Sequence, residues 1–146
     1  MNYNNLLNSI IKISNHAGEK ILAIYNSPNT SLEIEYKNDS SPLTIADKAS
    51  NEVIVDGLKN LDYNIPILSE EEKNVEYKIR KNWDIFWLVD PLDGTKEFIK
   101  RNGEFTVNIA LIKNGAPIMG VVYAPVINKT WYGLIDHGSY LIEKNK

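Results

Sequence analysis

The sequence predicts an α+β fold in which two helices pack on a mainly antiparallel sheet. Two segments with apolar residues at helical spacing come first, and several short apolar segments joined by tight turns follow them. Short turns between strands favour antiparallel neighbours, because parallel strands need long crossover connections. At 146 residues the chain has the length of one ordinary domain and can bury a substantial core.

The first predicted helix covers about residues 3–25, where apolar side chains recur at positions i, i+3, i+4 and i+7. The second covers about residues 45–59, and Thr44 is its expected N-cap. The apolar residues of the second helix predict the face that it buries: Ile45, Ala49, Val53, Ile54 and Leu58.

The predicted strands are short and mostly apolar. Residues 31–37 alternate apolar and polar side chains, and residues 65–68 form a brief apolar run. A meander of further strands, joined by turns rich in glycine, asparagine and aspartate, is expected near the C-terminus. These strands cover residues 105–112, 117–123, 130–135 and 139–142.

The most informative stretch is residues 85–98, which contains Asp90-Pro91-Leu92-Asp93-Gly94-Thr95. The apolar run before the motif predicts a buried strand that ends at Asp90, and Pro91 is expected to stop its ladder of hydrogen bonds. Asp93 is then expected to cap a short helix. A motif of this kind arises by chance on the order of 10⁻⁶ per position, so a merely solvated acidic turn is the weaker explanation.

This turn offers oxygen ligands and N–H donors within a few residues. Its two carboxylates, together with the Leu92 carbonyl, are the ligands that hard divalent cations prefer. The N–H groups at the start of the following helix suit an anion such as phosphate. One short segment is therefore predicted to hold both a metal ion and a phosphate group.

Two other acidic features have more than one interpretation. Ser69-Glu70-Glu71-Glu72 follows the strand at 65–68, and these acids are either a solvated loop or the source of a third ligand beside Asp90 and Asp93. Asp47 lies in the first turn of the second helix. On the residue pattern alone, its simpler role is to complement the helix macrodipole.

The composition argues against several classes of protein. A net charge of −3 is unfavourable for a nucleic-acid-binding surface, and the absence of cysteine excludes a disulfide framework and a cysteine nucleophile. No apolar run reaches the ~20 residues of a membrane span, and no signal peptide is evident. The two histidines, His16 and His137, are expected at the surface.

The Asp90 to Thr95 motif, with the Glu70-Glu71 pair upstream, resembles the Mg²⁺-dependent inositol monophosphatase superfamily. Residues 96–111 resemble more narrowly the 3′(2′),5′-bisphosphate nucleotidases of the CysQ type, and segments 41–47, 66–71 and 120–125 match the same pattern. The resemblance covers nearly the whole chain. It implies the N-terminal half of the layered αβαβα sugar-phosphatase fold.

The resemblance also implies a set of metal ligands. Glu70, Asp90 and the Leu92 carbonyl would bind a first Mg²⁺, and Asp90 and Asp93 would share a second. Glu70 would also hold a more weakly bound third ion. Glu70, Leu92 and Asp93 are further expected to contact the substrate.

Catalytic roles are implied in the same way. Gly94 and Thr95 would bind the scissile phosphate through backbone N–H groups. The Thr95 hydroxyl, hydrogen-bonded to Asp47, would orient and deprotonate the attacking water, and Glu70 is the third expected catalytic residue. The resemblance therefore favours a functional role for Asp47 over the macrodipole role.

The reaction implied is Mg²⁺-dependent hydrolysis of the 3′-phosphate of adenosine 3′,5′-bisphosphate to AMP and phosphate, in sulfur assimilation. Two alternatives stay open: a non-catalytic remnant that binds metal or a partner, and an inositol monophosphatase. The expected partner is a small nucleotide. Neither a nucleic-acid partner nor a transmembrane segment is expected. The expected location is the cytoplasm, with peripheral association on the cytoplasmic face of the inner membrane.

Members of the resembled family are longer, and their second domain carries a Trp-Asp-x-Ala-Ala-Gly-like motif that this sequence lacks. Residues 1–146 are therefore expected to be an N-terminal α+β metal-binding domain without the C-terminal α/β domain of relatives. A sheet edge left exposed in this way is expected to favour self-association.

Overall fold

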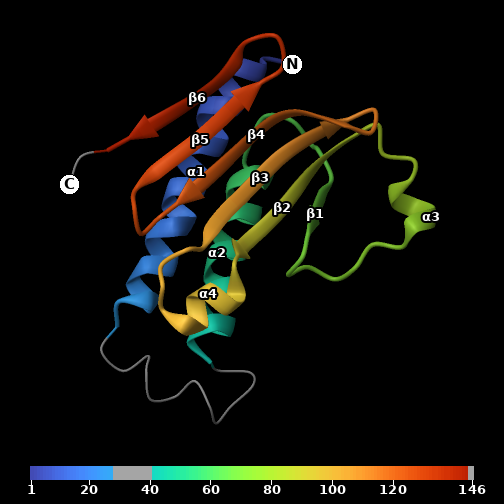
Figure 1. Ribbon diagram of the computed structural model, residues 1–146. Helices are drawn as coiled ribbons and strands as arrows, with labels where there is room; N and C mark the ends of the chain where they lie inside the picture. The colour runs from blue at the N-terminus through green and yellow to red at the C-terminus, as the bar shows by residue number, and fades with distance from the viewer. Residues whose placement is uncertain (28–40, 145–146) are drawn as a thin grey trace.

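The computed structural model describes residues 1–27 and 41–144, and in it two long helices lie on one face of a six-stranded sheet (Figure 1). The strands are arranged in chain order, so each pairs with its neighbours in the sequence. β1 and β2 are parallel, and all the other pairs are antiparallel. The predicted α+β fold with a mainly antiparallel sheet is confirmed. The strand predicted at 31–37 lies outside the described residues.

The two long helices have clear N-terminal caps. α1 (Tyr3–Tyr25) matches its prediction, and the Asn2 side chain caps it by accepting from the Asn5 N–H. α2 (Pro42–Lys59) begins earlier than predicted, because Ser41 rather than Thr44 is the N-cap and Pro42 takes the first helical position, where no N–H donor is needed. No helix within the described ranges combines the length and apolar character of a membrane span.

The face that α2 buries also differs from the prediction. Ile54 and Leu58 are buried as expected, and Ala49 and Val53 are partly buried, but Ile45 is 45% exposed. The buried residues in the first half of the helix are instead small or polar: Pro42, Ala46, Asp47, Ser50 and Asn51. The polar side of α2 therefore faces inward, toward the carboxylates described below.

The strands alternate between side chains that face the helices and side chains that face away. The core lies between the sheet and the two long helices, and one buried cluster contains Trp87, Ile109 and Val121 from the sheet together with Ile10 and Ile21 from α1. The strands are β1 (Ile67–Ser69), β2 (Ile85–Asp93), β3 (Thr106–Lys113), β4 (Ala116–Ala124), β5 (Lys129–Leu134) and β6 (Gly138–Glu143). Two short helices, α3 (Tyr77–Arg80) and α4 (Thr95–Lys100), complete the described chain, and α3 was not predicted.

β2 continues through Pro91, which was expected to stop it. Asp90 pairs with Asn108 and Asp93 pairs with Thr106, so β2 carries one more residue than β3 over this interval. An extra residue of this kind is a β-bulge, which bends the strand and redirects its side chains. Pro91 is tolerated because the ladder is already irregular at this point.

The turn after the bulge is made by a glycine. Gly94 has φ 98° and is the residue before α4, so it rather than Asp93 occupies the N-cap position. The prediction that Asp93 caps the helix was wrong, because Asp93 still belongs to β2. α4 is anchored by Phe98, which is buried in the core.

The second face of the sheet is not covered by any helix from the described ranges (Figure 1). We call it the open face, and we define it by seven residues on the five strands from β2 to β6: Leu88, Ala110, Gly120, Val122, Trp131, Gly133 and Leu141. These residues line a groove of about 720 Å³ that ends at Glu70 and Asp90. The acidic residues therefore lie at one end of an apolar surface.

Candidate active site

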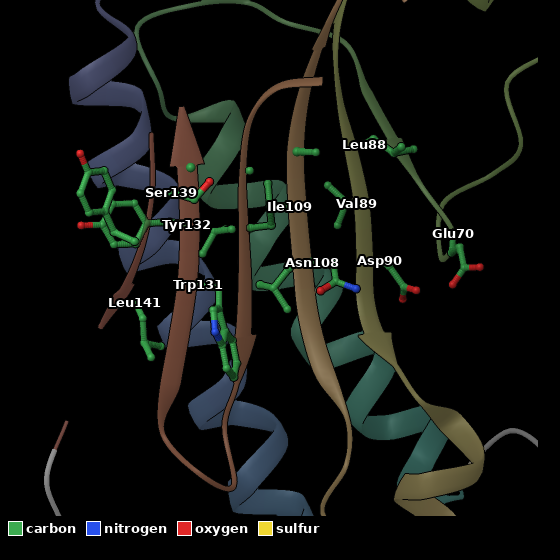
Figure 2. A pocket seen from close by; sticks show the side chains of 16 residues that line it. Glu70, Leu88, Val89, Asp90, Asn108, Ile109, Trp131, Tyr132, Ser139 and Leu141 are labelled. Carbon is green, nitrogen blue, oxygen red and sulfur yellow. The ribbon is translucent and has the colours of Figure 1, made fainter. Parts of the chain in front are cut away.

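The predicted acidic residues come from three elements that meet at the bulge of β2. Asp90 and Asp93 flank the bulge itself. Glu70 follows β1, and its N–H donates to the Val89 carbonyl at 3.3 Å, so the parallel pairing continues far enough to bring Glu70 beside Asp90. Figure 2 shows Glu70 and Asp90 close together at this end of the sheet.

Asp47 reaches the same place from α2, which packs on β2. One turn further along the helix, the buried Ser50 hydroxyl donates to the Pro91 carbonyl at 2.7 Å. This hydrogen bond attaches the helix directly to the bulge, and it uses a carbonyl that the irregular ladder leaves available. The structure thus brings Asp47, Glu70, Asp90 and Asp93 into one corner.

The electrostatics of Asp90 reflect these neighbours. Burial, followed by the negative charges of Glu70 and Asp93 and the proximity of the Glu70 carboxyl group, raises the pKa of Asp90 to about 6. The backbone N–H of Leu92 opposes this rise in the pKa. Burial and like charges held close together both favour the protonated form, so the raised pKa reflects burial first and repulsion among the carboxylates second.

Asp47 responds in the same way. Burial, followed by the charges of Glu71, Asp90 and Glu70, raises the pKa of Asp47 to about 7. The macrodipole role considered for Asp47 would lower its pKa rather than raise it. Burial beside other acids is therefore the dominant influence on this side chain.

One oxygen of Asp90 lacks a protein partner. Oδ1 is buried and makes no hydrogen bond. An unpaired buried carboxylate oxygen is costly, and in native proteins such atoms are commonly satisfied by an ion or a water. A divalent cation bound by neighbouring carboxylates would satisfy this atom.

The side chains fit a hard divalent cation in their chemistry, because it prefers carboxylate oxygens. As they stand, no three Asp, Glu or His side chains of the described residues form a ready metal site. Glu70 and Asp93 are exposed, and Asp93 is held by its hydrogen bond with Asn108. The feature that points to an ion is therefore the buried Oδ1 of Asp90.

The remaining predicted residues lie at the start of α4. Asp93 is exposed, and its Oδ2 accepts a hydrogen bond from the Asn108 amide at 3.0 Å. Thr95 is also exposed. Within the described chain no hydrogen bond joins the Thr95 hydroxyl to Asp47, so that expected contact is not formed in this structure.

Several polar residues around the site were not predicted. Asn108 lies beside Asp90 on the neighbouring strand (Figure 2) and orients Asp93. An asparagine in the middle of an apolar strand is unfavourable and is a signal that sequence reasoning could have used. Ser50 and Asn51 lie near Asp47 on the buried side of α2. Their helical spacing from Asp47, at i+3 and i+4, was a second such signal.

Comparison with known proteins gives the relatives of this chain. The model of the inositol monophosphatase family matches residues 2–145. The 3′(2′),5′-bisphosphate nucleotidase CysQ of Escherichia coli (strain K12) is 51% identical over 123 residues, which are 84% of this chain and 49% of the relative. The protein of the same name from Buchnera aphidicola is 46% identical over 132 residues, 90% of this chain and 49% of the relative. The chain spans about half the length of these curated relatives.

Solved structures show the same relationship. CysQ from Bacteroides thetaiotaomicron is similar with a TM-score of 0.88 and 48% identity, over 96% of this chain and 49% of that one. Inositol monophosphatase from Anabaena is similar with a TM-score of 0.77 and 25% identity, over 97% of this chain and 48% of that one. The chain therefore belongs to the inositol monophosphatase family.

Proposed function

We propose that residues 1–146 form the N-terminal α+β domain of a metal-dependent phosphomonoesterase that hydrolyses the 3′-phosphate of adenosine 3′,5′-bisphosphate to AMP and phosphate. The names of the CysQ relatives support this substrate, and the family is a group of metal-dependent phosphatases. The observation that carries the proposal is the buried, unpartnered Oδ1 of Asp90 in the corner shared with Glu70 and Asp93.

The proposed metal is Mg²⁺. Glu70, Asp90 and the Leu92 carbonyl would hold one ion, Asp90 and Asp93 a second, and Glu70 a weaker third. When bound, the metal would acidify a water molecule and neutralise charge on the phosphate. Glu70, Leu92 and Asp93 are also proposed to contact the substrate, and of the three Glu70 lines the groove of the open face.

The substrate phosphate is proposed to lie against the backbone of Gly94 and Thr95. Asp47 has its pKa raised to about 7, within the range in which a carboxylate can accept a proton near neutral pH. The Thr95 hydroxyl would pass the proton of the attacking water toward Asp47. Thr95 is exposed at the start of α4, where its hydroxyl is accessible to a substrate.

Two alternatives remain. An inositol monophosphatase is supported by the fold shared with the Anabaena enzyme. The other is a chain that binds metal or a partner without catalysis, and the measurement of turnover below separates it from the two enzymes. The partner proposed here is a small nucleotide, and a cytoplasmic location with peripheral membrane association stays a prediction.

The decisive experiment measures phosphate release with Mg²⁺ from two substrates, adenosine 3′,5′-bisphosphate and inositol monophosphate. It uses the 146-residue chain and a chimera in which the chain replaces the matching segment of the E. coli relative, with Asp90→Asn as the inactive control in each. A titration with Mn²⁺, monitored by electron paramagnetic resonance, measures metal binding independently of turnover.

We expect the chimera to release phosphate from adenosine 3′,5′-bisphosphate and the Asp90→Asn chimera to release none. Release from inositol monophosphate alone would favour the first alternative. If both proteins bind Mn²⁺ but neither turns over either substrate, the non-catalytic alternative is supported. A folded chain and a folded chimera that both fail to bind Mn²⁺ would contradict the proposal.

A further inference from the structure

The three acids after β1 lie in a tight turn whose two ends meet. The Glu72 N–H donates to the Ser69 carbonyl at 3.2 Å, and this hydrogen bond closes a four-residue turn. Glu70 and Glu71 are therefore the two central residues of the turn, and their side chains project from it. The position of the turn decides where both carboxylates stand.

One side chain of α2 bonds both ends of this turn. Asn51 is buried, and its Oδ1 accepts from the Ser69 hydroxyl at 2.7 Å while its Nδ2 donates to Glu72 Oε1 at 3.0 Å. An ionised carboxylate only accepts hydrogen bonds, so the amide nitrogen must face Glu72 and the amide oxygen must face Ser69. Asn51 lies one helical turn after Asp47, on the same side of α2.

Few other interactions of the described chain hold the turn. β1 has only three residues, and beyond it the Glu70 N–H contact with the Val89 carbonyl is 3.3 Å long. Glu70, Glu71 and Glu72 are all exposed, and Ser69 pairs with Val89 at the end of β1. The buried Asn51 amide is thus the contact that joins both ends of the turn to a long helix.

We propose that Asn51 is a positioning residue that ties both ends of the Ser69–Glu72 turn to the helix carrying Asp47, and thereby fixes Glu70 beside Asp90. The inference rests on the proposed function, because Glu70 matters here as a ligand. It also separates the roles of the three acids. The Glu72 carboxylate accepts the hydrogen bond from Asn51, which leaves the carboxylates of Glu70 and Glu71 for the site.

The test uses two variants of the 146-residue chain. Asn51→Asp keeps an acceptor for Ser69 but places a carboxylate against the carboxylate of Glu72. The double variant Asn51→Asp/Glu72→Gln keeps the wild-type net charge and reverses the donor and acceptor, since the introduced glutamine amide can donate to the introduced carboxylate. Two quantities are measured: amide hydrogen exchange of residues 70–72 in chelator, and Mn²⁺ affinity.

Asn51→Asp is expected to speed amide exchange in the turn and to weaken Mn²⁺ binding by about tenfold or more, the usual effect of losing a residue that orients a ligand. The double variant is expected to recover most of both. Ile54→Val is the matched control, because Ile54 is buried on the same helix and touches none of the turn's hydrogen bonds.

A folded Asn51→Asp chain with unchanged exchange and unchanged Mn²⁺ affinity would overturn the inference. Equal losses in Asn51→Asp and Ile54→Val would overturn it too, because they would reflect stability alone. If neither the wild-type chain nor the chimera binds Mn²⁺, the proposed function fails. In that case, faster amide exchange of residues 70–72 in Asn51→Asp, reversed in the double variant, would still support the contact of Asn51 with both ends of the turn.

Discussion

Among single residues, Asp90 and Thr95 should separate metal binding from chemistry. Asp90→Asn keeps the shape of the side chain but removes the charge beside Glu70, so we expect metal binding and turnover to be lost together.

Thr95→Ala removes a hydroxyl from an exposed position. It should leave most of the metal affinity and slow the chemical step by about a hundredfold, as expected for a residue that assists proton transfer. Mn²⁺ titration and single-turnover kinetics measure the two effects, and an unchanged rate in Thr95→Ala would contradict its role in orienting water.

The raised pKa of Asp47 predicts a pH dependence of stability at the same scale. In chelator, the pKa of Asp47 is about 7 in the folded state against an ordinary value of 3.8. Between these values the folded state binds more protons than the unfolded state, so the free energy of unfolding falls as pH rises. Asp90 acts in the same direction up to its pKa of about 6.

Urea unfolding across this pH window should therefore give a steeper decline for the wild type than for Asp47→Asn. Asp56→Asn, at an exposed position of the same helix, controls for the loss of one charge. Added Mg²⁺ should stabilise the wild type more as pH rises, because the cation binds the ionised carboxylates. A wild-type decline no steeper than that of Asp47→Asn would show that the pKa of Asp47 is not raised in the folded state.

At the scale of the structural element, the turn from β2 into α4 depends on Gly94. A Cβ at Gly94 would lie 2.8 Å from the Glu104 carbonyl oxygen and 3.2 Å from the Phe105 Cα, and the φ of 98° is unfavourable for other residues. Gly115, in the turn between β3 and β4, has a similar φ of 77° but no atom within 4 Å of the added Cβ. Comparing the two alanine variants therefore separates backbone strain from steric clash.

Gly115→Ala should cost about 1–2 kcal/mol of unfolding free energy, the cost of a left-handed conformation. Gly94→Ala should cost about 1–3 kcal/mol more, because backbone atoms must move to admit the methyl group. It should also weaken Mn²⁺ binding, since Asp93 precedes the displaced turn. Chemical denaturation gives the free energies, and equal losses in the two variants would show that the close approach at Gly94 relaxes freely.

Some of the elements could be predicted from the sequence, and others could not. Periodicity located α1 and the meander because their apolar residues face one core. The same rule failed for the first half of α2, where Ile45 is exposed and Asn51 is buried, because this helix buries polar groups against the site rather than apolar groups against the sheet. The passage of β2 through Pro91 depends on its register with β3, which is set by strand pairing and not by local propensity.

On the scale of the whole molecule, the open face predicts how the isolated chain behaves in solution. Trp131 is 41% exposed and Leu141 is 45% exposed on adjacent strands, and β6 is the last strand of the sheet. Contiguous apolar surface beside an unpaired strand edge favours association. We therefore expect the 146-residue chain to self-associate in a concentration-dependent way, as sedimentation velocity would show.

Two lysine variants identify the surface responsible. Trp131→Lys places a charge in the middle of the open face and should shift the chain toward monomer, because burying an unpaired ammonium group is costly. Ile79→Lys, at a position 56% exposed on α3, adds the same charge away from that face and should leave association unchanged. Association that persists in Trp131→Lys would point instead to backbone pairing along β6, which a side chain on the open face does not block. A wild-type chain that stays monomeric at every concentration would contradict the prediction, and would mean that the groove beside Trp131 is tolerated in water without a partner.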